Sequence, residues 1–480
     1  MLVAATLAAR VLVAPLGAQT RPDTTRRAPG DSARGTAARV DPDSLAARLA
    51  RAEAAIALLR QQLGTESESA VRARSRVAFE VSARLLTNTS WTSRATDDRN
   101  VPSFAVPEIR ARAGGVVGLS VRQTRVGAGL VVRGVLGGTL DADADVDFYG
   151  GTRDANGDRP LFPEPRLRTA GARLAWPSGF VVVGAETPLV SDLDPRSLAA
   201  VGVPVFGAAG NLWNWLPQVR ASRELVRTGR GRGAVRWAVQ GAVLMPYAGT
   251  SYAPPDSTLP PAAGGDPYAP SGGSGGDAAE RSGRPSLETR LRARWGPEDP
   301  DAPPQTDIRD FGVGEGPSEV GVGLHRGWLR LANVGLVDAG AVTADARIAF
   351  ARHFELRAEA YGGQLLAGLG GGAVGQNFGA TAPGAPAGSF GSAVRTVAGW
   401  AQVNAQATRT FVAGIGCGID HPRRADHPDR ERNAACATHV RWQPAQPLVL
   451  GVEYRRLATR YAGGRTFAAD HLNLALGVEL

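Results

Sequence analysis

Two stretches of this sequence place several charged side chains at every second position. Thr139–Tyr149 alternates apolar residues with four aspartates: Asp141, Asp143, Asp145 and Asp147. Ser286–Trp295 alternates mostly apolar residues with four charges: Glu288, Arg290, Arg292 and Arg294. Charges with a period of two lie on one face of a β-strand, and such a face needs water or opposite charges around it. The chemistry that these rows favour is electrostatic recognition of ions.

Neither row is a catalytic or metal-binding motif. Asp154–Asp158 resembles part of a calcium loop, but its glycine is misplaced and no bidentate glutamate follows, so a polar turn is favoured. His421 and His427 lie in an arginine-rich segment without fixed ligand spacing, which favours a solvated loop. The six histidines include none in a recognisable nucleophile motif. We therefore predict a protein that is not an enzyme and has no catalytic residue, metal or cofactor.

The two cysteines, Cys417 and Cys436, lie almost symmetrically about the segment 420–434. By parity, each shares a strand face with apolar residues. Neighbouring strands bring opposed residues within disulfide range, and an exported protein offers the oxidising compartment that a disulfide needs. We therefore predict that these two residues form a disulfide that clamps a hairpin.

From residue 76 to the end of the chain, the apolar pattern has a period of two. About sixteen such segments follow one another, joined by connections that alternate between short and long. The last segment puts five apolar residues on one face: Leu472, Leu474, Leu476, Val478 and Leu480. An outer-membrane barrel satisfies the edge of such a final strand by pairing it with the first. An edge strand of a soluble sandwich is the alternative.

The combined pattern predicts an all-β fold, a transmembrane antiparallel β-barrel of about sixteen strands over residues 76–480. A soluble sandwich gives no reason for a charged face opposite a continuous apolar one. The apolar parity flips near Arg122–Arg125, which predicts a bulge. The net charge is +9, but the basic residues, all of them arginine, are spread along the strands. This distribution argues against nucleic-acid binding.

The N-terminal part has a different organisation. Residues 1–18 resemble a secretory signal peptide with cleavage after Ala18, and residues 19–40 have the composition of a flexible spacer. Over 41–64, apolar residues repeat with alternating spacings of 4 and 3. This repeat predicts a short periplasmic coiled coil that associates when the barrels bring copies together. An amphipathic helix lying on the same chain is the alternative.

Three short motifs resemble those of the DcaP-like trimeric outer-membrane porins. Val121–Gly127 resembles the family's RQSR strand, Gly184–Thr187 the start of its central loop, and Leu216–Arg220 the RQPQIRY exit from that loop. The chain departs from the pattern at Glu186, where the family has Gln, and at Leu480, where such barrels end in an aromatic residue. The resemblance implies an outer-membrane trimer with one water-filled pore per subunit that passes small anions such as dicarboxylates.

A pore of about sixteen strands is too wide to select by diameter alone. The resemblance implies that residues 187–216 fold inward as a constriction loop; an external loop is the alternative. Its candidate residues are Asp192, Asp194, Arg196, Trp213 and Trp215. The loop would then face an arginine wall that favours anions; solvated lumen residues with no role in selectivity are the alternative. That wall comprises Arg166, Arg168, Arg290, Arg292 and Arg294, with Asp141–Asp147 on the opposite side.

The expected protein is a porin embedded in outer-membrane lipid, a homotrimer through barrel and coiled coil, passing small anionic solutes. A phosphate-selective porin is one alternative, but its hallmark lysine cluster is absent because the chain has no lysine. A structural barrel that tethers the envelope and conducts little is another. An outer-membrane lipase is disfavoured by the histidine argument above.

Overall fold

The structure is a computed structural model of the chain. It describes residues 77–108, 115–150, 163–229, 233–249, 277–297, 312–331, 334–384 and 389–480. The predicted signal peptide (1–18), spacer (19–40) and coiled coil (41–64), together with the Asp154–Asp158 turn, lie outside the described residues. They remain predictions.

The described residues form antiparallel strands, with short helices in the connections between them. The strands are β1 (Val77–Thr92), β2 (Val116–Ser120), β3 (Arg125–Val135), β4 (Gly138–Gly150), β5 (Glu164–Trp176), β6 (Gly179–Glu186), β7 (Leu216–Thr228), β8 (Val235–Leu244), β9 (Ser286–Trp295), β10 (Ser318–Leu331), β11 (Gly335–Phe350), β12 (Phe354–Gln364), β13 (Arg395–Thr408), β14 (Phe411–Pro422), β15 (Arg430–Ala445), β16 (Leu448–Tyr461) and β17 (Thr466–Glu479). The helices are η2 (Glu280–Ser282), η4 (Ala367–Leu369), α2 (Gly372–Gly375) and η5 (Arg424–Asp426). No helix in the described ranges is long and apolar enough to cross a membrane.

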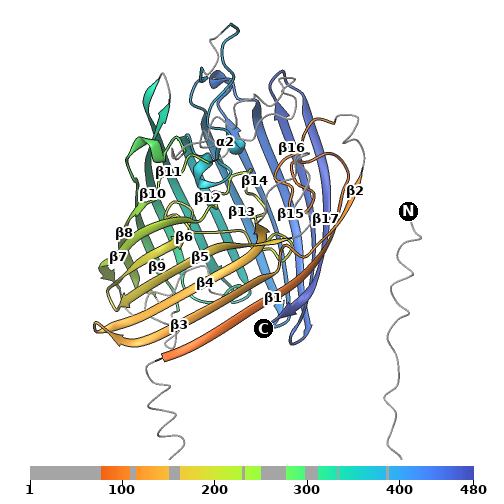
Figure 1. Cartoon of the computed structure of the whole chain (residues 1–480). Coiled ribbons are helices and arrows are strands. Elements are labelled where there is room, and N and C mark those ends of the chain that lie inside the picture. Colours follow the sequence, from red (N-terminus) through yellow and green to blue (C-terminus); the bar gives the residue numbers. More distant parts are fainter. Residues whose placement is uncertain are drawn as a thin grey trace, which may run out of the picture. The chain divides into compact units, whose positions relative to one another are not determined.

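The strands close into a barrel (Figure 1) because β17 pairs with β1. Both β2 and β3 pair with β1, so they are two parts of one strand. The interruption is a turn in which the backbone N–H of Thr124 donates to the carbonyl of Val121 at 3.0 Å, at the position where the parity flip predicts a bulge. With β2 and β3 counted as one, the described barrel has sixteen strands. The predicted all-β class and strand number are confirmed.

The two faces of the barrel differ as the alternation predicts. On β17, Leu474 and Leu476 are 47% and 56% exposed on the outer surface. Asn473, between Leu472 and Leu474, points inward and is 1% exposed. Outward apolar and inward polar residues are the arrangement of a barrel that contacts lipid.

The connections at the two ends of the barrel differ in length. Turns such as Arg409–Thr410 and Gln446–Pro447 lie at one end, which we call the short-turn end. Long connections, among them 187–215 and 365–394, lie at the other, the long-loop end. The connection 296–317, at the short-turn end, is an exception. In outer-membrane barrels the short turns face the periplasm.

The predicted disulfide is confirmed. Cys417 of β14 lies directly opposite Cys436 of β15, and the two residues are bonded. Both face outward and are exposed. The bond therefore clamps the β14–β15 hairpin from the outer surface of the barrel.

We expect reduction of this bond to lower the free energy of unfolding by about 3 kcal/mol. A cross-link across 19 residues removes loop-closure entropy from the unfolded chain. Urea unfolding of the protein in lipid vesicles, with and without reductant, measures the effect. The double variant Cys417→Ala/Cys436→Ala is the control and should not respond to reductant. Identical midpoints for the oxidised and reduced wild type would contradict the prediction.

Candidate functional site

Parts of three long connections contact the inward-facing side chains of the barrel. We name them the first loop (93–108), the central loop (187–216) and the third loop (365–384). In the first loop, the backbone N–H of Ala105 donates to the hydroxyl of Thr459 on β16 at 2.9 Å. In the third loop, the backbone N–H of Val374 donates to Asp420 on β14 at 3.0 Å. The candidate site is therefore built from barrel wall and loops together.

The central loop has an apolar core of its own. Phe206 is fully buried and packs against Trp400 of β13 and Leu457 of β16. Leu189 and Leu212 are also fully buried, in a second cluster that includes Tyr361 of β12. Burial of these side chains helps to hold the loop against the wall.

Polar contacts attach the central loop to the wall at several points. Asp192 lies 3.2 Å from the guanidinium of Arg290 on β9. The guanidinium of Arg196 donates to both carboxylate oxygens of Glu355 on β12, at 2.6 and 3.0 Å. The Asn211 amide donates to Glu359 of the same strand at 2.7 Å.

The predicted row Glu288–Arg294 points inward from β9, but its arginines are buried in ion pairs. Arg290, with 0% of its side chain exposed, contacts Glu319 at 2.9 Å and Asp345 at 2.5 Å. Arg294 and Arg292 contact the same Glu319 at 2.7 and 3.3 Å. These three arginines point toward the interior, but they do not present an open basic wall. They form a compensated cluster, which we call the Arg290 cluster.

Glu288, the first residue of the row, also holds the loop. Its carboxylate accepts a hydrogen bond from the backbone N–H of Leu189 at 2.6 Å and contacts His325 of β10 at 2.9 Å. Glu288 is 2% exposed. It is therefore a loop anchor with little contact to water.

A second cluster surrounds Glu355. Besides Arg196, its carboxylate binds Arg347 of β11 and Arg357 of β12, each at 2.7 Å. Arg357 also donates to the backbone carbonyl of Asp194 at 3.1 Å. Sequence reasoning recognised the polar faces of these strands but did not select their residues. The signal that could have selected them is that Arg347 of β11 lies directly opposite Arg357 of β12 when the two strands pair.

The aspartate row on β4 does not form a wall opposite Arg166 and Arg168. Because β4 pairs with both β3 and β5, its aspartates bind arginines on those neighbours. Asp147 binds Arg166 at 2.6 Å, and Asp145 binds Arg125. Arg168 lies 3.7 and 3.8 Å from Asp145 and Asp147. The aspartates of this row therefore act electrostatically on the arginines of the neighbouring strands β3 and β5. Asp143 is exposed and Asp141 is half-buried, toward the short-turn end.

Aromatic rings hold the arginines of β5. The guanidinium carbons of Arg168 and Arg166 lie 4.5 and 5.2 Å from the ring centroid of Trp215 in the central loop. Trp213 packs edge-on against Trp215, with 5.5 Å between ring centroids. These predicted loop residues thus position cationic groups on the barrel wall.

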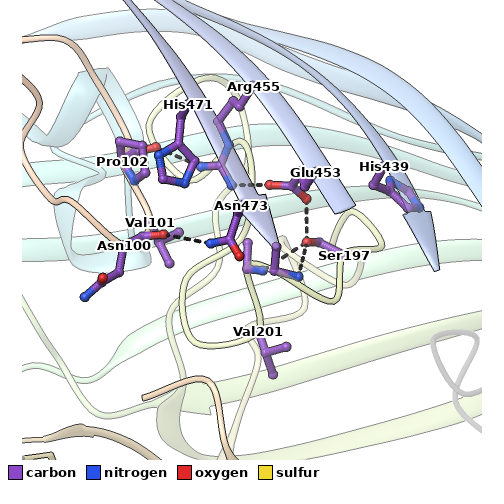
Figure 2. A network of polar contacts seen from close by, with 12 residues as sticks. Asn100, Val101, Pro102, Ser197, Val201, His439, Glu453, Arg455, His471 and Asn473 are labelled. Atoms are coloured by element: carbon purple, nitrogen blue, oxygen red, sulfur yellow. Dashed lines mark hydrogen bonds and ion pairs between the residues drawn. The ribbon is translucent and has the colours of Figure 1, made fainter. Parts of the chain in front are cut away.

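A polar network on β16 joins the first loop to the central loop (Figure 2). Glu453 accepts hydrogen bonds from Arg455 at 2.7 Å and from the Ser197 hydroxyl of the central loop at 2.5 Å. Arg455 also donates to the carbonyl of Pro102 in the first loop at 2.7 Å. Sequence reasoning missed this network. Both loops lack periodicity, so no pattern indicates where they dock.

Among the described residues, no group of three or more His, Cys, Asp or Glu side chains could hold a metal ion. The arrangement is chemically suited to electrostatic binding of ions and polar solutes, since its charged groups are guanidinium and carboxylate groups in close pairs.

The barrel has the fold of outer-membrane porins. Among solved structures, the outer membrane channel DcaP of Acinetobacter baumannii is similar to this chain. The similarity covers 85% of this chain and 98% of the DcaP chain, with 14% sequence identity and a TM-score of 0.55. The similarity to an anion-selective porin from Comamonas acidovorans covers 84% of this chain and 100% of that porin's chain, with 10% sequence identity and a TM-score of 0.47. The likeness to DcaP confirms the resemblance inferred from the motifs, at the level of the fold. No protein-family model and no curated protein matches the chain.

We expect Glu319→Gln to lower the free energy of unfolding by about 3–5 kcal/mol, because it removes a buried carboxylate that Arg290, Arg292 and Arg294 share. Urea unfolding in lipid vesicles measures the loss. The matched control is Asp338→Asn, which breaks an exposed pair with Arg326 and should cost less than about 1 kcal/mol. Equal losses for the two variants would contradict a compensated cluster at Glu319.

The first loop should respond to pH through Asp97, whose carboxylate accepts hydrogen bonds from the backbone N–H groups of Ser103 and Phe104 at 2.8 and 3.0 Å. Burial raises the pKa of Asp97 from 3.8 to about 6. The folded loop therefore favours the protonated carboxyl. This contribution to stability is complete below pH 3.8 and is lost as the pH rises through about 6.

Hydrogen exchange of the amides in 93–108, corrected for intrinsic rates, should show stronger protection at pH 4.5 than at pH 7.5. In Asp97→Asn this difference should disappear, because the asparagine does not titrate. Protection that is unchanged, or that increases with pH, would refute the role of Asp97.

Proposed function

We propose that the protein is an outer-membrane porin for the passive diffusion of small hydrophilic solutes, with a modest preference for small anions such as dicarboxylates. The observation that carries the proposal is the closed sixteen-strand barrel with an apolar outer face and a charged inner face. The contacts of the central loop with inward-facing side chains support a constriction inside the barrel.

The solute path, in this proposal, runs along the wall formed by β1, β3, β5 and β15. Four inward-facing arginines there keep 29–39% of their side chains exposed: Arg84, Arg125, Arg166 and Arg441. The carboxylates that they bind are less exposed, at 9% for Asp145, 0% for Asp147 and 22% for Glu479. A passing solute would therefore meet guanidinium groups first, which favours anions.

The proposed assembly is a homotrimer in the outer membrane with the N-terminal coiled coil in the periplasm. The start of β1 supports this orientation, because Val77 pairs with Val132 near the short-turn end of the barrel. The coiled coil would then add a second contact between subunits.

A structural barrel that conducts little is the second candidate. It is favoured by the extent to which loops fill the interior, since inward-facing residues such as Arg290, Arg347 and Glu355 have 0% of their side chains exposed. The two candidates differ in conductance.

Single-channel recording in a planar bilayer under a salt gradient tests the proposal. We expect stepwise openings in groups of three and an anion-selective reversal potential. Arg125→Gln/Arg166→Gln should shift that potential toward cations, because it removes two partly exposed charges. Arg326→Gln, which removes an exposed charge from the outer surface, is the control and should change nothing. A silent bilayer would instead support the structural barrel.

A further inference from the structure

The outer surface of β13 and β14 carries a groove at the long-loop end of the barrel. Its volume is about 710 Å³, and its lining includes Arg395, Val397, His421, Arg423 and Arg424. The groove lies on the opposite face of the wall from the candidate solute path, and none of the interior contacts described above uses it.

The strand register fixes the direction of these side chains. Val397 of β13 pairs with His421 of β14, while the adjacent pair is Thr396 with Pro422. Thr396 points inward and binds Asp420, so Val397 and His421 point outward side by side. Arg395, two residues before Val397, is exposed on the same face. The backbone N–H of Arg423 donates to the Arg395 carbonyl at 2.8 Å, which brings these two residues together.

The rim of the groove carries more positive than negative charge. Arg395 binds Asp426, and Arg424 and Arg460 both bind Glu431, each at 3.1 Å. Three arginines, Arg395, Arg423 and Arg424, line the groove, and two of them bind the carboxylates Asp426 and Glu431, which leaves an excess of one positive charge among these groups. Asp426 has only 2% of its side chain exposed, so an approaching group meets the arginines.

The groove lies at the upper edge of an apolar surface. Below it, the outward positions of β13 and β14 are occupied by small or apolar residues down to Ala405 and Ala413. Val397 to Ala405 spans about 27 Å along the strand at roughly 3.4 Å per residue. With a strand tilt of about 40°, this corresponds to roughly 20 Å across a membrane, close to the apolar band of outer-membrane barrels. Arg395 and Arg423 would therefore lie at the depth of lipid headgroups.

We propose that this groove binds the phosphate headgroup of an anionic lipid in the outer leaflet. The guanidinium groups of Arg423 and Arg424 bind phosphate oxygens, since arginine presents paired donors that match a phosphate. An acyl chain runs down the wall over Gly399 and Ala401, beside the exposed Ile419. Basic pockets at a membrane surface recognise lipid headgroups in this way. The proposal rests on the outer-membrane location proposed above.

Native mass spectrometry of the protein in detergent, titrated with diphosphoryl lipid A, tests the proposal. We expect the wild type to retain one lipid per subunit. The variant Arg423→Gln/Arg424→Gln should bind this lipid at least tenfold more weakly. The matched control is Arg352→Gln/Arg409→Gln, which removes two exposed arginines from turns at the short-turn end and should bind as the wild type does. Val397→Trp, which fills the groove without changing its charge, should also weaken retention and separates this role from the Arg424–Glu431 contact.

Several results would overturn the proposal. One is equal retention by all variants. Another is complete competition by inorganic phosphate at equal concentration, because the lipid chain would then contribute nothing. Loss of the trimer in the Arg423/Arg424 variant with lipid retention unchanged would make the groove a subunit contact. Conductance recorded on the same preparations tests the proposed porin function separately. Lipid retention can be measured in a protein that does not conduct, and conductance in a protein that does not retain the lipid.

Discussion

The interior depends on the compensation of buried arginines. On the barrel wall, Arg290, Arg292 and Arg294 surround two carboxylates, Glu319 and Asp345. Asp192 of the central loop supplies the third carboxylate. A buried charge without a partner is costly, and the loop and wall therefore stabilise each other. The apolar packing of Leu189 and Phe206 then adds a contribution that does not depend on charge.

Arginine suits this arrangement better than lysine. The guanidinium of Arg290 contacts Asp192, Glu319 and Asp345 at once, and it also donates to Gln240 at 2.9 Å. A planar group with five donors can bridge several acceptors, whereas an ammonium acts as a point charge. The absence of lysine from the chain fits an interior built from such bridges. The same property makes the arginines of the outer groove suitable for phosphate.

The features predicted from the sequence are those that depend on local periodicity. The alternation in Asp470–Leu480 predicts which side chains face outward, and the spacing of Cys417 and Cys436 about a loop predicts their pairing. Partners that are distant in the chain had no such signal. Arg196 and Glu355 are 159 residues apart, and their contact depends on how an aperiodic loop folds. The charged rows therefore looked like an open wall, although their charges are compensated by residues elsewhere.

The Glu453–Arg455 network has a consequence for the order in which the chain can fold. Residues of the first loop and of the central loop are bound by β16. Arg455 and Pro102, for example, are 353 residues apart in the sequence. By contrast, the Cys417–Cys436 hairpin closes across only 19 residues. Contacts between distant residues form slowly because loop-closure entropy opposes them. The interior can therefore be completed only after the last strands are in place. Until then, the chain is an open sheet in which Pro102 and Ser197 lack their partners on β16.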